Sequence, residues 1–225
     1  MKKTFLVTGA SRGIGFDLVK YIAALGHKVF ALSRNTNSLE ASEMIFPFNI
    51  DITDEIALEK FTNELKQDEV IIDVLINNAG SLANKPFVNT SKEDFENIYR
   101  VNVFGLASLT RLLLPIILPE GHVINISSMG GIGGTSKFSG LSAYSSSKGA
   151  VNILTEILAE EFKETGPRFN ALALGAVQTE MLTKAFPGFQ APISASEMAA
   201  YIFKFSLEGH HFFNGKVLPV SSSTP

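Results

Sequence analysis

Short apolar runs alternate with longer amphipathic stretches along the whole chain. The apolar runs predict strands at residues 5–7, 28–32, 44–48, 71–76, 123–126, 168–174 and 216–220. Apolar residues at helical spacing predict helices at residues 13–25, 54–66, 92–114, 144–162 and 197–206. Thr53 or Asp54 is the expected N-cap of the second helix, and Ser91 that of the third. The strand-like runs are apolar throughout, which is typical of a parallel sheet covered on both faces.

The order of these elements indicates the fold class. Strand and helix alternate from end to end, which predicts an α/β fold with a doubly wound, mostly parallel, Rossmann-like sheet. We expect about seven strands with helices on both faces. The 225 residues contain no Pro/Ser-rich linker, charge run or internal repeat. They therefore predict a single domain over residues 1–225.

Composition and charge exclude several classes of function. Nineteen basic and 22 acidic residues give a net charge of −3 without a basic stripe, so nucleic acid is not an expected partner. The absence of cysteine excludes disulfides, thiolate zinc sites and a cysteine nucleophile, and the four histidines show no metal-ligand spacing. The first apolar run stops at Thr8, too early for a signal peptide, and polar residues and a proline interrupt the apolar stretch 101–118. We therefore expect a soluble cytoplasmic protein that binds no membrane.

Tyr144 and Lys148 are the first candidate for chemistry. They lie four residues apart at the start of the most regular predicted helix, so the phenol and the ammonium share one face. A phenol titrates near 10, and a neighbouring ammonium favours the phenolate, which would help the tyrosine to act as acid or base. Taken alone, the pair is better explained as two exposed side chains that happen to lie four residues apart.

A glycine-rich turn is the second candidate. Residues 8–15 read Thr-Gly-Ala-Ser-Arg-Gly-Ile-Gly and join the first strand to the first helix. Such a turn lets the backbone approach a ligand, and the helix N-terminus offers N–H groups to an anion such as a pyrophosphate. The same residues form the G-x-S-x-G pattern of a hydrolase nucleophile around Ser11. No earlier strand supplies a second oxyanion N–H, and neither His210 nor His211 has a clearly placed acidic partner, so we disfavour a hydrolase.

Further motifs lie between these two in the sequence. Thr8-Gly9-x-x-x-Gly13-x-Gly15, Asn77-Asn78-Ala79-Gly80, Asn102, Ser128 and Tyr144-x-x-x-Lys148 follow one another along the chain. In this order and approximate spacing they resemble the short-chain dehydrogenase/reductase family. The resemblance extends from residue 4 to about residue 181 and resumes weakly at residues 214–220.

The resemblance implies a catalytic set of four residues. Tyr144 would donate a proton to a carbonyl, while Lys148 would lower the pKa of Tyr144 and hold the nicotinamide ribose. Ser128 would hydrogen-bond the substrate oxygen, and Asn102 would hold a relay water. The segment between Ser128 and Tyr144 is longer than is usual in the family, so Ser127 or Ser142 could replace Ser128.

A cofactor site follows from the same resemblance. Its predicted members are Gly9, Ser11, Arg12, Gly13, Ile14, Gly15, Ser33, Arg34, Asp51, Ile52, Asn78, Ala79, Gly80, Tyr144, Lys148, Gly175, Val177 and Thr179. Asp51 would meet the edge of the adenine and Ile52 its face. Sites that prefer NAD usually carry an acid at the end of the second strand, where this chain has Ser33 followed by Arg34. Arg34 and Arg12 suit a 2′-phosphate, so we predict NADP(H).

The substrate side departs from the family pattern. The segment at about 181–194, which would form the substrate loop, is short, and Leu174-Gly175 stands where the family usually has Pro-Gly. A curtailed loop predicts an open pocket for apolar or aromatic carbonyl compounds with modest specificity.

The resulting expectation is an NADP(H)-dependent oxidoreductase that reduces an aldehyde or ketone to an alcohol, or the reverse. A 3-oxoacyl thioester reductase, with its carrier near Lys137 or Lys184, and a nucleotide-binding module without turnover are the alternatives. The helices at 92–114 and 144–162 have wide apolar surfaces and predict a homodimer or homotetramer.

Overall fold

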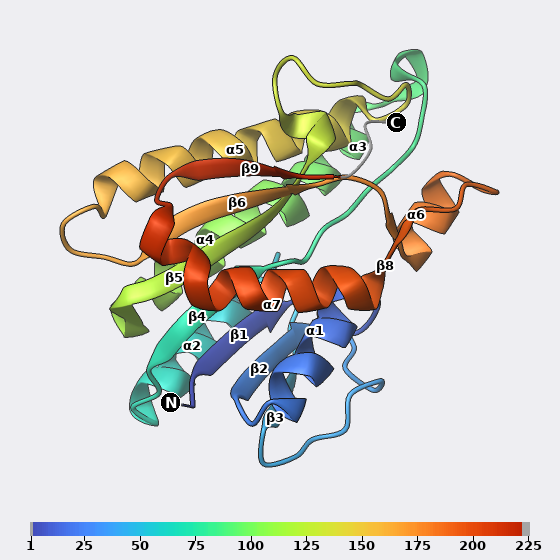
Figure 1. Ribbon diagram of the computed structural model, residues 1–225. Coiled ribbons are helices and arrows are strands. Elements are labelled where there is room, and N and C mark those ends of the chain that lie inside the picture. The colour runs from blue at the N-terminus through green and yellow to red at the C-terminus, as the bar shows by residue number, and fades with distance from the viewer. Residues whose placement is uncertain (1, 222–225) are drawn as a thin grey trace.

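The computed structural model describes residues 2–221. Their helices and loops are arranged around a central parallel sheet (Figure 1). Within these residues the main sheet has seven strands in the order β3-β2-β1-β4-β5-β6-β9. Their bounds are β1 Thr4–Thr8, β2 Lys28–Ser33, β3 Ile45–Asn49, β4 Ile72–Asn77, β5 Ile117–Ser128, β6 Arg168–Leu174 and β9 Lys216–Val220. Every neighbouring pair is parallel. The predicted fold class is confirmed.

Helices cover both faces of the sheet, as Figure 1 shows. On one face α1 (Gly13–Ala24) and α7 (Ala195–Phe212) enclose a core that includes Phe5, Val7 and Ile202. On the other face α2 (Glu55–Gln67), α4 (Leu106–Leu113) and α5 (Ser142–Glu161) bury Leu6 and Phe169. Successive strand residues point to opposite faces, so a strand that is apolar at every position serves both cores.

The strand order reverses between β1 and β4. The chain builds outward from β1 through β2 to β3, then returns to place β4 on the other side of β1. In parallel sheets the crevice at the carboxyl ends of such a pair is where ligands bind. The glycine turn and the Asn78–Gly80 segment follow the carboxyl ends of β1 and β4, and Ser128 is the last residue of β5, so the topology gathers them at one edge.

Local capping signals predicted two of the helix starts. The Asp54 side chain accepts a hydrogen bond from the Ala57 N–H at 3.0 Å, which makes Asp54 rather than Thr53 the cap of α2. At the start of α3 (Lys92–Tyr99) the Ser91 hydroxyl accepts a hydrogen bond from the Asp94 N–H at 3.1 Å. The Asp94 carboxylate in turn accepts one from the Ser91 N–H. Each cap satisfies N–H groups that the helix itself leaves unpaired.

The predicted helix at residues 92–114 is not one regular helix. After α3 the chain passes through a π-helical segment, η2 (Arg100–Gly105), before α4 and the short turn η3 (Leu114–Ile116). A Cβ at Gly105 would lie 2.7 Å from the Ile52 carbonyl oxygen, so this close approach requires glycine. The predicted helix is therefore present over its whole range, and only the π-helical segment within it was not foreseen, because helical periodicity does not distinguish a π segment from an α-helix.

The C-terminal part of the chain holds more structure than predicted. The helix expected at 197–206 extends from Ala195 to Phe212, and it begins at Ala195 because Ser194 and Glu197 form a capping box. The expected substrate loop contains α6 (Glu180–Ala185), which is capped by Thr179, and β8 (Ile193–Ser194), which pairs with β7 (Val177–Gln178). Two short 3-10 turns, η1 (Phe87–Asn89) and η4 (Met129–Gly131), complete the elements. Of the helices formed by residues 2–221, none is both long and apolar enough to cross a membrane.

Candidate active site

Tyr144 and Lys148 lie in the first two turns of α5, on one face as predicted. The Lys148 Nζ is 5.9 Å from the centre of the Tyr144 ring. Lys148 is 4% exposed, and its ammonium donates a 2.7 Å hydrogen bond to the Ile126 carbonyl of β5. Burial lowers the pKa of Lys148 to about 8, so the side chain still carries most of its charge at pH 7.

Ser128, at the carboxyl end of β5, is hydrogen-bonded to Tyr144. Burial raises the pKa of the Tyr144 phenol above its ordinary value, and the Ser128 hydrogen bond opposes this rise. The sequence predicted that Lys148 would lower this pKa. In the structure burial is the largest influence on this pKa, and the Lys148 ammonium is hydrogen-bonded to the Ile126 carbonyl.

The other two candidate serines are placed differently. The Ser127 hydroxyl is buried and donates to the Lys148 carbonyl at 3.3 Å. The Ser142 hydroxyl is also buried, and it has no hydrogen-bond partner within residues 2–221. Of the three serines, Ser128 is the one that the structure couples to Tyr144.

Asn102 is fully buried in the π-helical segment η2. Its Oδ1 accepts from the Ser81 N–H at 2.7 Å, and its Nδ2 donates to the Ser81 carbonyl and to the Ser147 hydroxyl, each at 2.9 Å. Ser147 immediately precedes Lys148, so Asn102 ties the segment after β4 to the first turns of α5. The side-chain amide is engaged in these bonds, and a role with a relay water stays a prediction.

The glycine turn forms a cradle at the start of α1. Gly9 and Gly13 have φ angles of +68° and +54°, in the left-handed region that favours glycine. A Cβ at Gly15 would lie 2.3 Å from the Gly9 carbonyl oxygen, while Ile14 packs against the core. As far as the described chain shows, α1 has neither a side-chain cap nor an acid in its first turn. Its first N–H groups therefore suit an anion such as a pyrophosphate.

The Asn78–Gly80 segment fixes this turn against β4. The Asn78 Nδ2 donates to the Thr8 carbonyl at 2.9 Å and to the Gly9 carbonyl at 3.3 Å, and the Ala79 N–H donates to the Thr8 hydroxyl. A Cβ at Gly80 would lie 3.8 Å from the Lys148 Nζ. The glycine turn and the Tyr144–Lys148 pair are therefore parts of one site.

The residues predicted for the adenosine end lie beyond β2 and β3. The Ser33 hydroxyl donates to the Ser11 hydroxyl at 2.9 Å. Arg34 is exposed and has no polar partner among the described residues. Asp51 accepts two hydrogen bonds from the turn that follows it, and Ile52 is buried. An unpaired guanidinium at this position is free to meet an anionic group.

The segment after β6 returns to the glycine turn. The Gly175 N–H donates to the Val220 carbonyl at 2.9 Å, and Val177 is buried. Thr179 packs on Gly13, because its Cγ2 would lie 3.3 Å from a Cβ at that glycine. The Arg12 guanidinium forms an exposed ion pair with Glu180 at 3.5 Å. These contacts set α6 beside the cofactor cradle.

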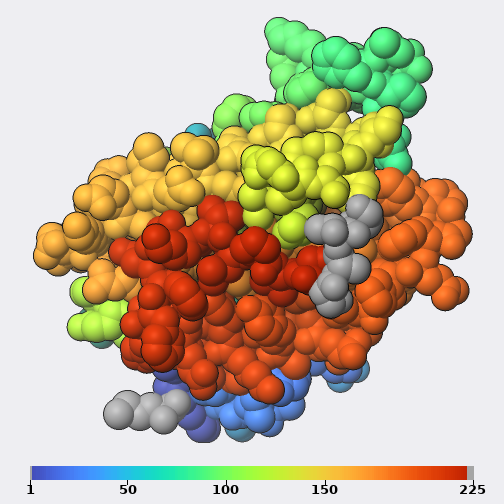
Figure 2. Space-filling view, turned by 45° about the horizontal axis from the view of Figure 1, so that its top comes forward, coloured from blue at the N-terminus to red at the C-terminus, as the bar shows by residue number. Residues whose placement is uncertain are grey.

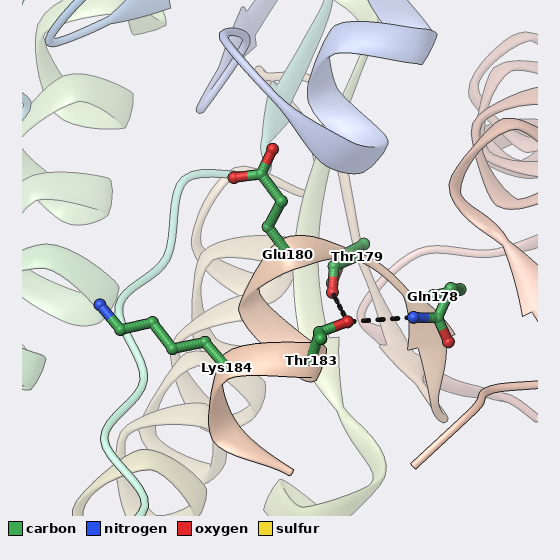
Figure 3. Close-up of a pocket in the computed structure, with 5 residues that line it drawn as sticks. All are labelled: Gln178, Thr179, Glu180, Thr183 and Lys184. Atoms are coloured by element: carbon green, nitrogen blue, oxygen red, sulfur yellow. Dashed lines mark hydrogen bonds between the residues drawn. The ribbon is translucent and has the colours of Figure 1, made fainter. Parts of the chain in front are cut away.

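A hollow of about 490 Å³ lies along α6. Figure 3 shows Thr183 hydrogen-bonded to Gln178 and Thr179 on one side of the helix, while Glu180 and Lys184 extend to the other. The residues that line this hollow are polar.

A family model described as short chain dehydrogenase matches residues 3–188. The chain belongs to the short-chain dehydrogenase/reductase family. It is 32% identical to the NADPH-dependent pterin aldehyde reductase of Arabidopsis thaliana, over 88% of this chain and 86% of that protein. It is also 32% identical to the 2-(R)-hydroxypropyl-CoM dehydrogenase of Xanthobacter autotrophicus, over 80% of this chain and 77% of that one. The chain is therefore an oxidoreductase of this family, which binds nicotinamide cofactors.

Solved structures agree with the fold. ElxO with NADP bound is 28% identical, with a TM-score of 0.83 over 98% of this chain and 97% of that one. The 4-hydroxyisoleucine dehydrogenase complexed with NADH is 23% identical, with a TM-score of 0.88 over 99% and 98% of the two chains. Both NADP and NADH thus occur among proteins of this fold.

Sequence reasoning missed some residues that build the site of this family member. Ser81 and Ser147 hold Asn102, and Glu180 pairs with Arg12. Neither serine stands out in the sequence, since both are small polar residues. The start of α6 did carry a signal, because Thr179 followed by Glu180 is a cap followed by an acid.

Proposed function

We propose that the protein is an NADP(H)-dependent carbonyl reductase that interconverts an aldehyde or ketone and the corresponding alcohol. The observation that carries this proposal is the coupling of Ser128 to Tyr144 with the Lys148 ammonium buried beside them. The glycine cradle at α1 suits the pyrophosphate of a dinucleotide. The bound nicotinamide would supply or accept a hydride at the substrate carbon.

The side chains of the site have complementary roles in the proposed reaction. The Ser128 and Tyr144 hydroxyls bind the carbonyl oxygen, where negative charge develops during reduction. Tyr144 transfers its proton to that oxygen, which completes the alcohol and leaves a phenolate. The Lys148 ammonium stabilises the phenolate and holds the nicotinamide ribose. Asn102 keeps α5 in register with the segment after β4.

The loop before α5 favours simple carbonyl compounds over a thioester. The Lys137 ammonium donates to the Ile132 carbonyl at 2.7 Å and to two oxygens of Thr135 at 2.9 Å. It is thus engaged within its own loop, which leaves only Lys184 of the two lysines considered for docking a carrier. The aldehyde reductase among the relatives also supports a carbonyl substrate.

Turnover assays with the wild-type protein test this function directly. We expect NADPH oxidation with an aromatic aldehyde, at a kcat/KM at least as high as with an acetoacetyl thioester. A strong preference for the thioester would support the reductase of that class instead. Tight NADPH binding without turnover of any aldehyde, ketone or thioester would support the nucleotide-binding module.

The cofactor preference rests on Arg34. We expect Arg34→Ala to lower kcat/KM for NADPH by about 10-fold to 100-fold. This is the loss expected when one or two charge-assisted hydrogen bonds to a 2′-phosphate are removed. The value for NADH should change by less than about twofold, because the 2′-hydroxyl carries no charge. Steady-state kinetics with both cofactors measure this.

Arg168→Ala is the matched control, since Arg168 begins β6 at the opposite end of the sheet. Equal kcat/KM values for NADPH and NADH in the wild type, or an unchanged NADPH preference in Arg34→Ala, would refute the assignment.

We also propose a homodimer or homotetramer that forms through η2 and α5. Phe104, Ile153 and Ile157 are 60%, 58% and 57% exposed, and the two isoleucines are four residues apart on one face of α5. Burying them against a second copy removes this apolar surface from water. Sedimentation velocity should show a dimer or tetramer at micromolar concentration, and Ile157→Lys should shift it toward monomer. A wild-type monomer under these conditions would disprove the proposal.

A further inference from the structure

Asn84 joins the segment after β4 to the short helix α6. Its Nδ2 donates a 2.8 Å hydrogen bond to the carbonyl of Ala185, the last residue of α6 and 101 positions away in sequence. The last four carbonyls of a helix have no partner within the helix, so this bond satisfies one of them. Asn84 therefore acts as a cap supplied by a distant part of the chain.

Asn84 also contacts the loop that leads to Tyr144. The Lys85 N–H donates to the Gly140 carbonyl at 2.9 Å, and Gly140 has a φ of +85°. A Cβ at Gly140 would lie 1.9 Å from the Asn84 Oδ1, so the side chain fits only because this residue is glycine. In Figure 2 the teal-green segment that follows β4, the yellow loop before α5 and the orange region that includes α6 lie on the same side of the molecule.

The other contacts of α6 lie mostly toward its N-terminal side, where Thr183 accepts a hydrogen bond from the Gln178 side chain at 3.0 Å. None of its six residues is buried, so the helix contributes no core packing of its own. At its N-terminal end, the Arg12–Glu180 ion pair is exposed, and such pairs contribute little. Just beyond its C-terminal end, the Phe186 ring meets the Phe138 ring edge-on, with 6.5 Å between centroids. The Asn84 hydrogen bond, which is itself exposed, is therefore one of these two contacts at the C-terminal end of α6.

We propose that Asn84 is a positioning residue that holds α6 closed over the bound carbonyl substrate. This inference rests on the proposed function, since it places the substrate between α6 and the Ser128–Tyr144 pair. Asn84 lies in neither the glycine cradle nor the Tyr144–Lys148 pair, so its loss should weaken retention of the substrate and leave cofactor binding unchanged.

Two variants test the Asn84–Ala185 hydrogen bond, called the clasp from here on, by enzyme kinetics. Asn84→Asp keeps the size of the side chain and removes the donor, and Asn84→Ala removes the side chain beyond Cβ. In both we expect KM for the carbonyl compound to rise about threefold to tenfold, the size of one neutral hydrogen bond. The kcat and the NADPH Kd, measured by fluorescence titration, should stay within about twofold. Asn89→Ala is the matched control, because Asn89 is exposed in the same segment and its side chain makes no hydrogen bond within residues 2–221.

A second measurement does not depend on turnover. Trypsin cleaves after Lys184, next to the carbonyl that Asn84 holds, and cleavage within a helix requires local opening. Release of fragment 1–184, followed by mass spectrometry, should be about threefold to tenfold faster in both Asn84 variants and unchanged in Asn89→Ala. An unchanged cleavage rate would overturn the clasp, and faster cleavage with an unchanged KM would overturn its role in holding substrate. If the wild type reduces no carbonyl compound, the proposed function fails, and faster cleavage would then support only the clasp itself.

Discussion

Tyr144→Phe is expected to lower kcat for carbonyl reduction by about 10²- to 10⁴-fold, the contribution of a positioned general acid. The substitution removes only the phenolic hydroxyl, which is the proton donor of the proposed reaction. Ser128 keeps a hydrogen bond from the Gly130 N–H at 3.3 Å, so its hydroxyl is not left without a partner. Folding and cofactor binding should therefore survive.

Single-turnover and steady-state reduction rates measure the loss, while thermal unfolding and NADPH fluorescence verify fold and binding. Tyr201→Phe is the matched control, because Tyr201 is an exposed tyrosine of α7, 42% accessible. Wild-type turnover in Tyr144→Phe would show that another group donates the proton. A loss of NADPH binding in the same variant would show that the effect is not confined to proton transfer.

Lys148→Met is expected to separate activity from stability. The rate should fall by about 10²-fold or more, because no cation remains to stabilise the Tyr144 phenolate. Cofactor affinity should fall as well, since the proposed ribose contact is lost. The free energy of unfolding at pH 7 should nevertheless rise by on the order of 1–3 kcal/mol, because the buried ammonium costs stability and a buried methionine does not.

The gain in stability should depend on pH. The folded-state pKa of Lys148 is about 8, below the ordinary value of 10.5 that applies to the unfolded chain. The cost of the buried charge is therefore complete below pH 8, decreases between about pH 8 and 10.5, and vanishes above that range. Urea unfolding at pH 7 and pH 9.5 should show a larger stabilisation by Lys148→Met at pH 7. Lys204→Met, at an exposed position on α7, should change stability little at either pH. Equal stabilisation at both pH values would contradict a buried ammonium.

The fold class depends on patterns that are local in sequence. Continuous apolar runs such as the one in β1 predict buried parallel strands wherever they lie in space, and the sheet confirms them. The pairing of Tyr144 with Lys148 is equally local, because a helix brings residues four apart to one face whatever surrounds it. The Ser91 cap is local for the same reason, since it joins Ser91 to Asp94 within four successive residues.

Other features were decided only when distant segments came together. Ser127 and Ser128 are adjacent and chemically identical, yet Ser127 bonds the Lys148 carbonyl and Ser128 contacts Tyr144. This difference follows from how α5 packs on β5. The pKa of Tyr144 depends on burial, which no spacing of residues specifies.

Helix α6 shows most clearly what local sequence patterns cannot predict. The N-terminal cap of α6 comes from Thr179, directly before the helix, whereas its C-terminal cap comes from Asn84, 101 residues earlier. Periodicity and capping signals extend over three or four residues, so they determined the strands, most helices and the Tyr144–Lys148 pair. The tertiary structure alone decided which hydroxyl meets Tyr144, where the charge of Lys148 is buried and what holds α6, because these depend on contacts between segments far apart in the chain.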